Sequence, residues 1–120
     1  MKVLFVEPGK KPYIEDIYGD LESLQKAVGG YIEFVYPFDD NVCLCCNEEG
    51  KLTGLELNRA LRDEDGEIYD IIAGTFLVLG LGEEDNVDLT EEQMRKYEKV
   101  FETPEMFIKM GGKICALPLV

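Results

Sequence analysis

Residues 54–82 read GLELNRALRDEDGEIYDIIAGTFLVLGLG and contain the most apolar run of the chain. Leu57 and Leu61 lie four positions apart, and this spacing predicts about two turns of helix that bury both leucines. An acidic turn at 63–67 follows, and residues 68–73 fit either a helix or a strand. Residues 75–79 are nearly all apolar, which predicts a strand at the centre of a sheet.

The segment before this stretch predicts a strand, a helix and a hairpin. Residues 2–6 fit a short apolar strand, and an extended segment through Ile14 and Ile17 leads to Gly19. Asp20 can cap a helix whose apolar positions 21, 24 and 28 recur at helical spacing, and Gly29-Gly30 ends it. Residues 31–38 and 42–47 flank an Asp-Asp-Asn turn, so we expect them to pair as a hairpin.

The segment after the stretch predicts a loop and a helix. Residues 80–88 are acidic and contain glycine, which is typical of a flexible loop. Thr90 and Gln93 match a capping box, in which each side chain satisfies a backbone N–H of the other residue. Met94, Tyr97 and Phe101 follow at helical spacing and predict an amphipathic helix.

The C-terminal residues predict one more helix and an apolar tail. Pro104 is tolerated at the first position of a helix, and a helix over 104–110 would pack Met106, Phe107 and Met110 inward. Gly111-Gly112 ends it. The tail, residues 113–120, could add a strand or cross to a partner chain.

These expectations define the fold class as α+β. We expect one small domain over residues 1–112, with a mostly antiparallel sheet of about four to five strands packed by two to three helices. The apolar C-terminal tail, 113–120, could form an added strand. A chain of 120 residues is long enough for a single hydrophobic core.

The charge balance argues against direct binding to nucleic acid. The chain carries 25 acidic and 12 basic residues, for a net charge of −13. Such a surface repels a phosphate backbone over most of its area. The two remaining interpretations are a self-repelling cytoplasmic protein and an acidic surface that imitates DNA.

The cysteines and the missing histidine argue against a metal site. The four cysteines are Cys43, Cys45, Cys46 and Cys115, and none forms the C-x-x-C spacing of a zinc ribbon. The chain has no histidine, the commonest metal ligand and general base. We therefore expect no metal and no cofactor, and cysteines packed as small apolar residues.

Motifs for catalysis are equally scarce. Ser23, the only serine, lies in a surface helix, and no Walker or G-x-S-x-G motif is present. Asp63-x-Asp65-Gly66 lacks the rest of a calcium loop. Gly80-Leu81-Gly82 lacks the third glycine of a nucleotide-binding turn, and acidic residues follow it. The sequence predicts a protein that is not an enzyme and has no membrane helix or signal peptide.

A small set of side chains could recognise an anion or a base. It comprises Lys10, Lys11, Tyr13, Asn58, Arg59, Arg62, Tyr69 and Thr75. Arginine suits phosphate because its planar guanidinium donates two parallel hydrogen bonds. The alternative is that Arg59 and Arg62 form ion pairs with Glu56, Asp63 or Asp65.

The chain also resembles a known but uncharacterised family of domains of unknown function, found in phages and conjugative elements. The resemblance covers roughly residues 1–108 and rests on four blocks: VEPGKKPY, GGYIEFVYPF, NEEGKLTGLELNRALRDEDGEIYDIIAGTFLVLG and PEMF. The recurrent positions are Glu7, Pro8, Gly9, Gly54, Leu57, Asn58, Arg59, Gly74 and Thr75. The cysteine cluster at 43–46 and the tail after Gly112 look particular to this sequence.

The resemblance implies a setting in the cytoplasm of a bacterial host and a non-enzymatic accessory role in countering host defence. One hypothesis is sequestration of a nucleotide-like signal or other small ligand, by a single chain or by a homo-oligomer. A second is an acidic protein–protein inhibitor that mimics DNA and blocks a nuclease, CRISPR or restriction complex. A third is a structural or regulatory protein with no defence role.

Overall fold

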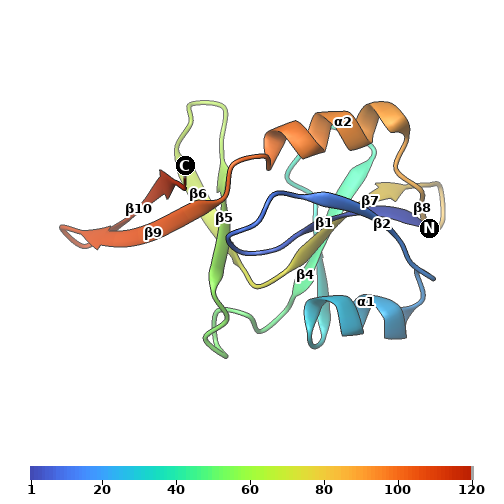
Figure 1. Ribbon diagram of the computed structural model, residues 1–120, viewed down its shortest axis with the longest axis horizontal. Helices are drawn as coiled ribbons and strands as arrows, with labels where there is room; N and C mark the ends of the chain where they lie inside the picture. The colour runs from blue at the N-terminus through green and yellow to red at the C-terminus, as the bar shows by residue number, and fades with distance from the viewer. Residues whose placement is uncertain (120) are drawn as a thin grey trace.

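The computed structural model describes residues 1–119, which form ten strands and two helices. The strands are β1 (Lys2–Val6), β2 (Tyr13–Asp16), β3 (Ile32–Val35), β4 (Val42–Asn47), β5 (Leu57–Arg62), β6 (Ile68–Ala73), β7 (Phe76–Leu81), β8 (Asn86–Val87), β9 (Glu105–Met110) and β10 (Lys113–Pro118). The helices are α1 (Leu21–Val28) and α2 (Glu91–Val100). Together they form a small α+β domain with antiparallel sheets (Figure 1).

The main sheet is built around β7. Its strand order is β2-β1-β7-β4-β3, and the short β8 pairs with the end of β7. Every pairing is antiparallel. The side chains of Phe76, Leu77, Val78 and Leu79 are fully buried, because both faces of this strand are covered. The prediction of a central strand at 75–79 is confirmed, as is the 31–47 hairpin, formed by β3 and β4.

Each face of the main sheet packs against one helix. Helix α1 covers one face and α2 the other (Figure 1). The α1 face buries Val3, Cys43, Cys45, Leu77 and Leu79 against Leu24 and Val28. The α2 face buries Leu4, Val6, Val42, Leu44, Phe76 and Val78 against Leu89, Tyr97 and Phe101, together with Leu61 and Ile72 of β5 and β6. The alternation of side chains along each strand thus supplies two separate cores.

Both predicted helix caps are present. The Asp20 carboxylate accepts a hydrogen bond from Ser23 N at 3.0 Å, and Gly29 ends α1 in the left-handed conformation. At α2, Gln93 N donates to Thr90 Oγ1 at 3.1 Å and Thr90 N donates to Gln93 Oε1 at 3.0 Å, so the capping box is complete.

The helix predicted at residues 57–62 is wrong, because these residues form strand β5. Strand β5 pairs with β6 across the acidic turn, and the register shifts twice, between Leu57 and Arg59 and between Leu61 and Arg62. The ambiguous segment 68–73 is therefore a strand. The buried side chains of Asn58 and Arg59 find partners in distant parts of the chain, and such tertiary bonding overrides local helix propensity.

The helix predicted at 104–110 is also wrong, because these residues form strand β9. Strand β9 pairs with β10 along its whole length, so the tail adds a strand. Gly111 and Gly112 both have positive φ, at 57° and 82°, as a two-residue hairpin turn requires. Met106 and Met110 are exposed, by 44% and 59%, and do not pack inward.

The count of strands therefore exceeds the predicted four to five, while the two helices agree with the prediction. Two small sheets, β5-β6 and β9-β10, lie beside the main sheet, and the acidic loop at 80–88 contains β8. Within residues 1–119, no helix is long and apolar enough to cross a membrane.

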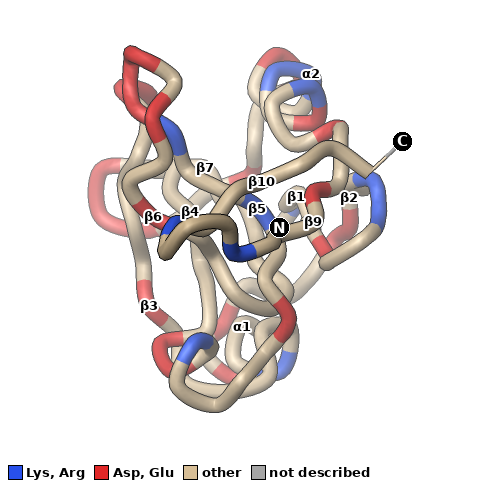
Figure 2. Tube along the Cα trace, turned by 90° about the vertical axis from the view of Figure 1, so that its left-hand side faces the viewer, with Lys and Arg blue, Asp and Glu red and all other residues tan. Residues whose placement is uncertain are grey.

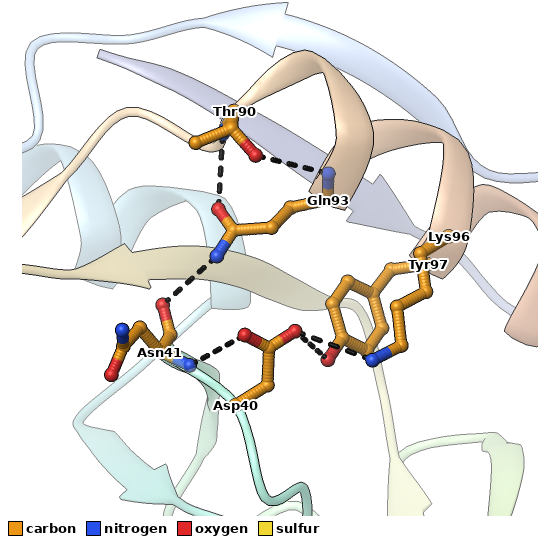
Figure 3. A network of polar contacts seen from close by, with 6 residues as sticks. All are labelled: Asp40, Asn41, Thr90, Gln93, Lys96 and Tyr97. Atoms are coloured by element: carbon orange, nitrogen blue, oxygen red, sulfur yellow. Dashed lines mark hydrogen bonds and ion pairs between the residues drawn. The ribbon is translucent and has the colours of Figure 1, made fainter.

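A polar network at the start of β4 fixes helix α2 on the sheet (Figure 3). The hydroxyl of Tyr97 donates to the Asp40 carboxylate at 2.7 Å, and Lys96 Nζ lies 3.4 Å from the same carboxylate. Gln93 Nε2 donates to the carbonyl of Asn41 at 3.4 Å. The Tyr97 ring is fully buried and packs 4.9 Å from the ring of Phe38. These contacts hold the β3–β4 connection against α2.

We predict that Tyr97→Phe lowers the free energy of unfolding by about 1–2 kcal/mol, because the Asp40 carboxylate loses a hydrogen bond while the ring still packs. Tyr18→Phe is the matched control, since Tyr18 is 94% exposed, and it should leave stability unchanged. Denaturant unfolding of the three proteins measures the difference. Equal stabilities would contradict this role of Tyr97.

The effect of Tyr97→Phe should also depend on pH. The hydrogen bond from Tyr97 holds the pKa of Asp40 below its ordinary value. A lowered folded-state pKa contributes stability that is present above the unfolded pKa, about 4, and is lost as pH falls through the folded pKa. The wild-type advantage over Tyr97→Phe should therefore be full at neutral pH and shrink in acid. An advantage that stays constant with pH would contradict the assignment.

Candidate functional site

Asn58 of β5 bridges the end of β1 and the β6–β7 connection. Its side-chain amide donates to the carbonyl of Val6 at 2.8 Å and to that of Gly74 at 2.9 Å. Val6 ends β1, and Gly74 directly follows β6 in the connection to β7. Since the β1–β7 ladder ends at the pair Val6 and Phe76, the amide closes the gap where the ladder stops.

Arg59 is the largest fully buried side chain of the described residues, with 1% exposure. Its guanidinium makes five hydrogen bonds, as many as it has N–H groups. Nε and Nη2 donate to the carbonyl of Phe101 at 3.2 and 2.9 Å. Nη2 also donates to the carbonyl of Lys10 at 2.7 Å, and Nη1 donates to Oδ1 and O of Asn58 at 2.8 and 3.4 Å.

The direct partners of Arg59 are carbonyl oxygens and contain no carboxylate. Burial lowers the pKa of Arg59, and the negative charge of nearby Glu105 acts in the opposite direction. Phe101 is the C-cap of α2, and a cation is favourable at that end of a helix. Arg59 therefore joins β5, the loop after β1 and the end of α2.

Gly74 is required where Asn58 contacts the chain. Its φ is +80°, and an added Cβ would lie 2.7 Å from Cδ1 of Leu55. Its N–H donates to the carbonyl of Glu56 at 2.7 Å. A residue with a side chain would be strained at this positive φ, and an added Cβ would also displace the end of the Leu55 side chain.

The structure does not bring the predicted ligand-binding residues into one site. Asn58 and Arg59 are buried and saturated with internal hydrogen bonds. The side chain of Lys10 is exposed and lies 3.6 Å from Glu7. Tyr13 stacks on Phe5, with ring centroids 5.4 Å apart, and Thr75 is half-buried beside β7.

Lys11 lies in a separate hollow. It faces α2 across a shallow cavity of about 410 Å³, lined also by Pro12, Arg95, Glu98, Lys99 and Glu102. Arg95 lies 3.4 Å from Glu91 on the same helix. This surface mixes exposed charges of both signs, as an ordinary helix face does.

Arg62 and Tyr69 do share a groove, between the β5–β6 hairpin and β10. Its volume is about 780 Å³. The charged and aromatic residues that line it are Lys51, Arg62, Glu67, Tyr69, Asp70 and Lys113. Tyr69 is 55% exposed, so its ring is accessible.

The three cations of the groove differ in their partners. Arg62 Nη2 donates to Oε2 of Glu105 at 2.6 Å, and Lys51 pairs with Asp70. Lys113 has no ion-pair partner within residues 1–119. Glu105, with a side chain only 10% exposed, also accepts from Ala60 N at 3.1 Å. The ion pair expected for Arg62 is thus formed with Glu105 rather than with Glu56, Asp63 or Asp65.

Sequence reasoning missed Lys51 and Lys113 as groove residues. They lie 62 positions apart, and no local pattern joins them. Within residues 1–119, no three acidic or cysteine side chains lie close enough to hold a metal ion. Burial raises the pKa of the Cys45 thiol to about 12, so this thiol stays protonated at neutral pH.

The chain matches the model of a known protein family over most of its length. The profile of DUF3846, a domain of unknown function, matches residues 1–102. The chain belongs to the DUF3846 family. The expected membership of an uncharacterised family is confirmed. The match contains Lys10, Asn58, Arg59 and Phe101, so the buried Arg59 network lies inside the DUF3846 domain, whereas the β9–β10 hairpin lies beyond the matched residues.

Curated relatives match a short part of the DUF3846 chain. FYN-binding protein 1 of Homo sapiens is 50% identical over 51 residues, which are 42% of this chain and 6% of that protein. The proteins of the same name from Mus musculus and Rattus norvegicus are 49% identical over 51 residues, with the same coverage. The chain thus spans a small fraction of these relatives, and the similarity transfers neither activity nor partner. No solved structure matches the chain.

We predict that Arg59→Lys destabilises the DUF3846 domain by about 3 kcal/mol, because a lysine cannot supply five planar donors and leaves buried carbonyls unpaired. Arg62→Lys is the matched control, and its partly exposed ion pair should cost less than about 1 kcal/mol. Chemical denaturation measures both. Similar costs for the two variants would contradict a structural role for Arg59.

Proposed function

We propose that this DUF3846 protein is a non-enzymatic binding protein whose groove between the β5–β6 hairpin and β10 takes an anionic aromatic small molecule, such as a nucleotide. The observation that carries the proposal is the composition of this groove. It joins three cations and an accessible tyrosine in a chain of net charge −13. The volume of about 780 Å³ falls within the range of small-ligand sites.

The chemistry of the groove fits the two parts of a nucleotide. The exposed ring of Tyr69 offers a flat face on which a base can stack. Lys113 forms no ion pair with any residue of 1–119, and Arg62 is 41% exposed beside Glu105, so both can approach phosphate oxygens. Among the residues predicted for a ligand site, Arg62 and Tyr69 carry this proposal, and Asn58 and Arg59 support the strand that presents Arg62.

The absence of catalytic chemistry in the sequence supports a binding role. The chain has no histidine and a single serine, Ser23, which lies in the first turn of α1 and donates its backbone N–H to the N-cap Asp20. We propose that the protein sequesters its ligand in the cytoplasm of a bacterial host, as an accessory protein of a phage or mobile element that counters host defence. This setting rests on the family resemblance.

A second candidate is an acidic inhibitor that mimics DNA and binds a host nuclease, CRISPR or restriction complex. The observation that favours it is the spread of acidic residues over the turns and loops, seen in Figure 2. Its binding to a basic partner would weaken steeply with salt, and removal of the Tyr69 ring, on which a base would stack, would leave that binding unchanged. A structural or regulatory role predicts neither behaviour.

We predict that ADP-ribose or cyclic di-AMP raises the melting temperature by several degrees at saturating concentration. A ligand at about 100 times its dissociation constant adds roughly 2.7 kcal/mol of stability, enough for such a shift in a domain of this size. Differential scanning fluorimetry gives the shift, and isothermal titration calorimetry gives the affinity.

Substitutions of the groove residues test whether the ligand binds in the groove. Arg62→Ala, Lys113→Ala and Tyr69→Ala should each weaken binding about tenfold, the effect of losing about 1.4 kcal/mol. Lys26→Ala removes the same charge from α1, on the opposite side of the main sheet, and should have no effect. A flat response to both ligands, or binding that survives Arg62→Ala and Lys113→Ala unchanged, would contradict the proposal.

A further inference from the structure

The β9–β10 hairpin projects from the body of the protein (Figure 1). The edge of β10 that faces away from β9 has no neighbouring strand among residues 1–119. In the part of the chain that the structure describes, strand β10 pairs only with β9, in a two-stranded sheet. The base of β9 is tied to β5 through Glu105, which accepts from Ala60 N. Isolated two-stranded ribbons are marginally stable in water, so the open edge of β10 is a natural place for a further strand.

The backbone pattern identifies the residues that face outward along this edge. Met110 and Lys113 close the two-residue turn, and Leu119 N donates across to the carbonyl of Pro104 at 2.8 Å. Odd-numbered residues of β10 therefore bond to β9, and the N–H and C=O groups of Ile114 and Ala116 point away from it. Pro118 falls on the same outward side and has no N–H, so the open edge ends there.

The edge of β10 also differs in charge from the other outer strands. Strand β2 carries Glu15 and Asp16, β3 carries Glu33 and β6 carries Asp70. Strand β10 has no acidic residue. Residues 105–120 hold two lysines and one glutamate, a net charge of +1, whereas residues 1–104 carry −14. In Figure 2 the hairpin points toward the viewer, with basic residues near its tip.

We propose that the open edge of β10 pairs with β10 of a second copy of this chain, antiparallel across a two-fold axis at Cys115. The usable edge runs from Lys113, after the Gly-Gly turn, to Leu117, before Pro118, and Cys115 is its centre. This register sets Ile114 opposite Ala116 of the partner subunit, and both residues present outward backbone groups. The two equivalent pairs each exchange two hydrogen bonds.

The same register avoids repulsion between the two acidic chains. Lys113 lies opposite Leu117 of the partner subunit, so the two lysines do not face each other. Copies that met at β2 or β3 would place carboxylates on both sides of the contact, which is destabilising. The β10 edge is therefore the outer edge at which a second copy meets least like charge.

The pairing also extends an apolar face. Direct partners in the hairpin share a face, so Met106, Ile108 and Met110 lie beside Cys115 and Leu117. Met106, Ile108, Met110 and Leu117 are 36–59% exposed. In a four-stranded ribbon β9-β10-β10-β9, the exposed apolar side chains of the two copies lie side by side across the axis. Cross-strand contacts then cover part of their surface.

The first test is the molar mass of the full chain in reducing buffer, by sedimentation and light scattering without ligand. We expect a concentration-dependent dimer. Cys115→Glu places two carboxylates face to face at the axis and should give a monomer. Met110→Glu adds the same charge to the same face of the hairpin, but on β9, and should still dimerise. A monomeric wild type, or equal effects of the two variants, would overturn the proposal.

The second test fixes the register by disulfide formation. Cys43, Cys45 and Cys46 are buried and Cys115 is half-buried, and directly opposed strand positions lie within disulfide reach. Oxidised glutathione, which accepts the two electrons and two protons of the thiol pair, should link two chains through Cys115. Cys115→Ser should abolish this product.

The matched control moves the thiol along the same strand. In a Cys115→Ser background, Leu117→Cys keeps the face and the strand. The proposed register separates the two new cysteines by four residues, roughly 13 Å along the strand, which is too far for a disulfide. Linkage at position 117 as fast as at 115 would overturn the register. Residues 113–116 also line the proposed ligand groove, so a second copy and a ligand would compete for this edge. Because this test contains no ligand, its failure is distinct from failure of the proposed groove.

Discussion

The guanidinium of Arg59 holds separate segments of the protein together from the inside. A buried cation is costly unless its hydrogen bonds are all made, and here five bonds to backbone and amide oxygens satisfy the group. Their acceptors lie after β1, at the end of α2 and in β5 itself. Moving any of these segments would leave a buried donor or carbonyl without a partner. The position of β5 against the main sheet follows from this requirement.

The fixed position of β5 in turn determines the exposed surface. Asn58 and Arg59 face the interior, so Arg62 at the end of the same strand lies at the rim of the groove, where Glu105 holds it. Glu105 also anchors the start of β9 through Ala60, and β10 forms the other wall. The family match ends at residue 102, so the groove combines a wall of the DUF3846 domain with a hairpin beyond the matched residues.

The sequence predicts those parts of the fold that depend on local signals. The caps at Asp20 and Thr90, the hairpin turn at 39–41 and the apolar run of β7 each act within a few residues, and all were identified. Strand β5 was missed because Arg59 bonds to Phe101, 42 residues away, and no local spacing contains that partner. Strand β9 was missed because its apolar pattern suits either a helix or a strand until β10 pairs with it. At the groove, Arg62 and Tyr69 were found by their chemistry, whereas Lys113 is brought there only by the hairpin.

Hydrogen exchange of the Arg59 side chain tests the central claim most directly. The Nε–H of Arg59 and that of Arg62 can be followed separately by NMR in the intact protein. If Arg59 organises the fold, its Nε–H should exchange only through global unfolding, with a free energy close to that of denaturation. The Nε–H of Arg62 should exchange rapidly through local motion. Rapid exchange at Arg59, equal to that at Arg62, would show that the buried network does not hold the fold together.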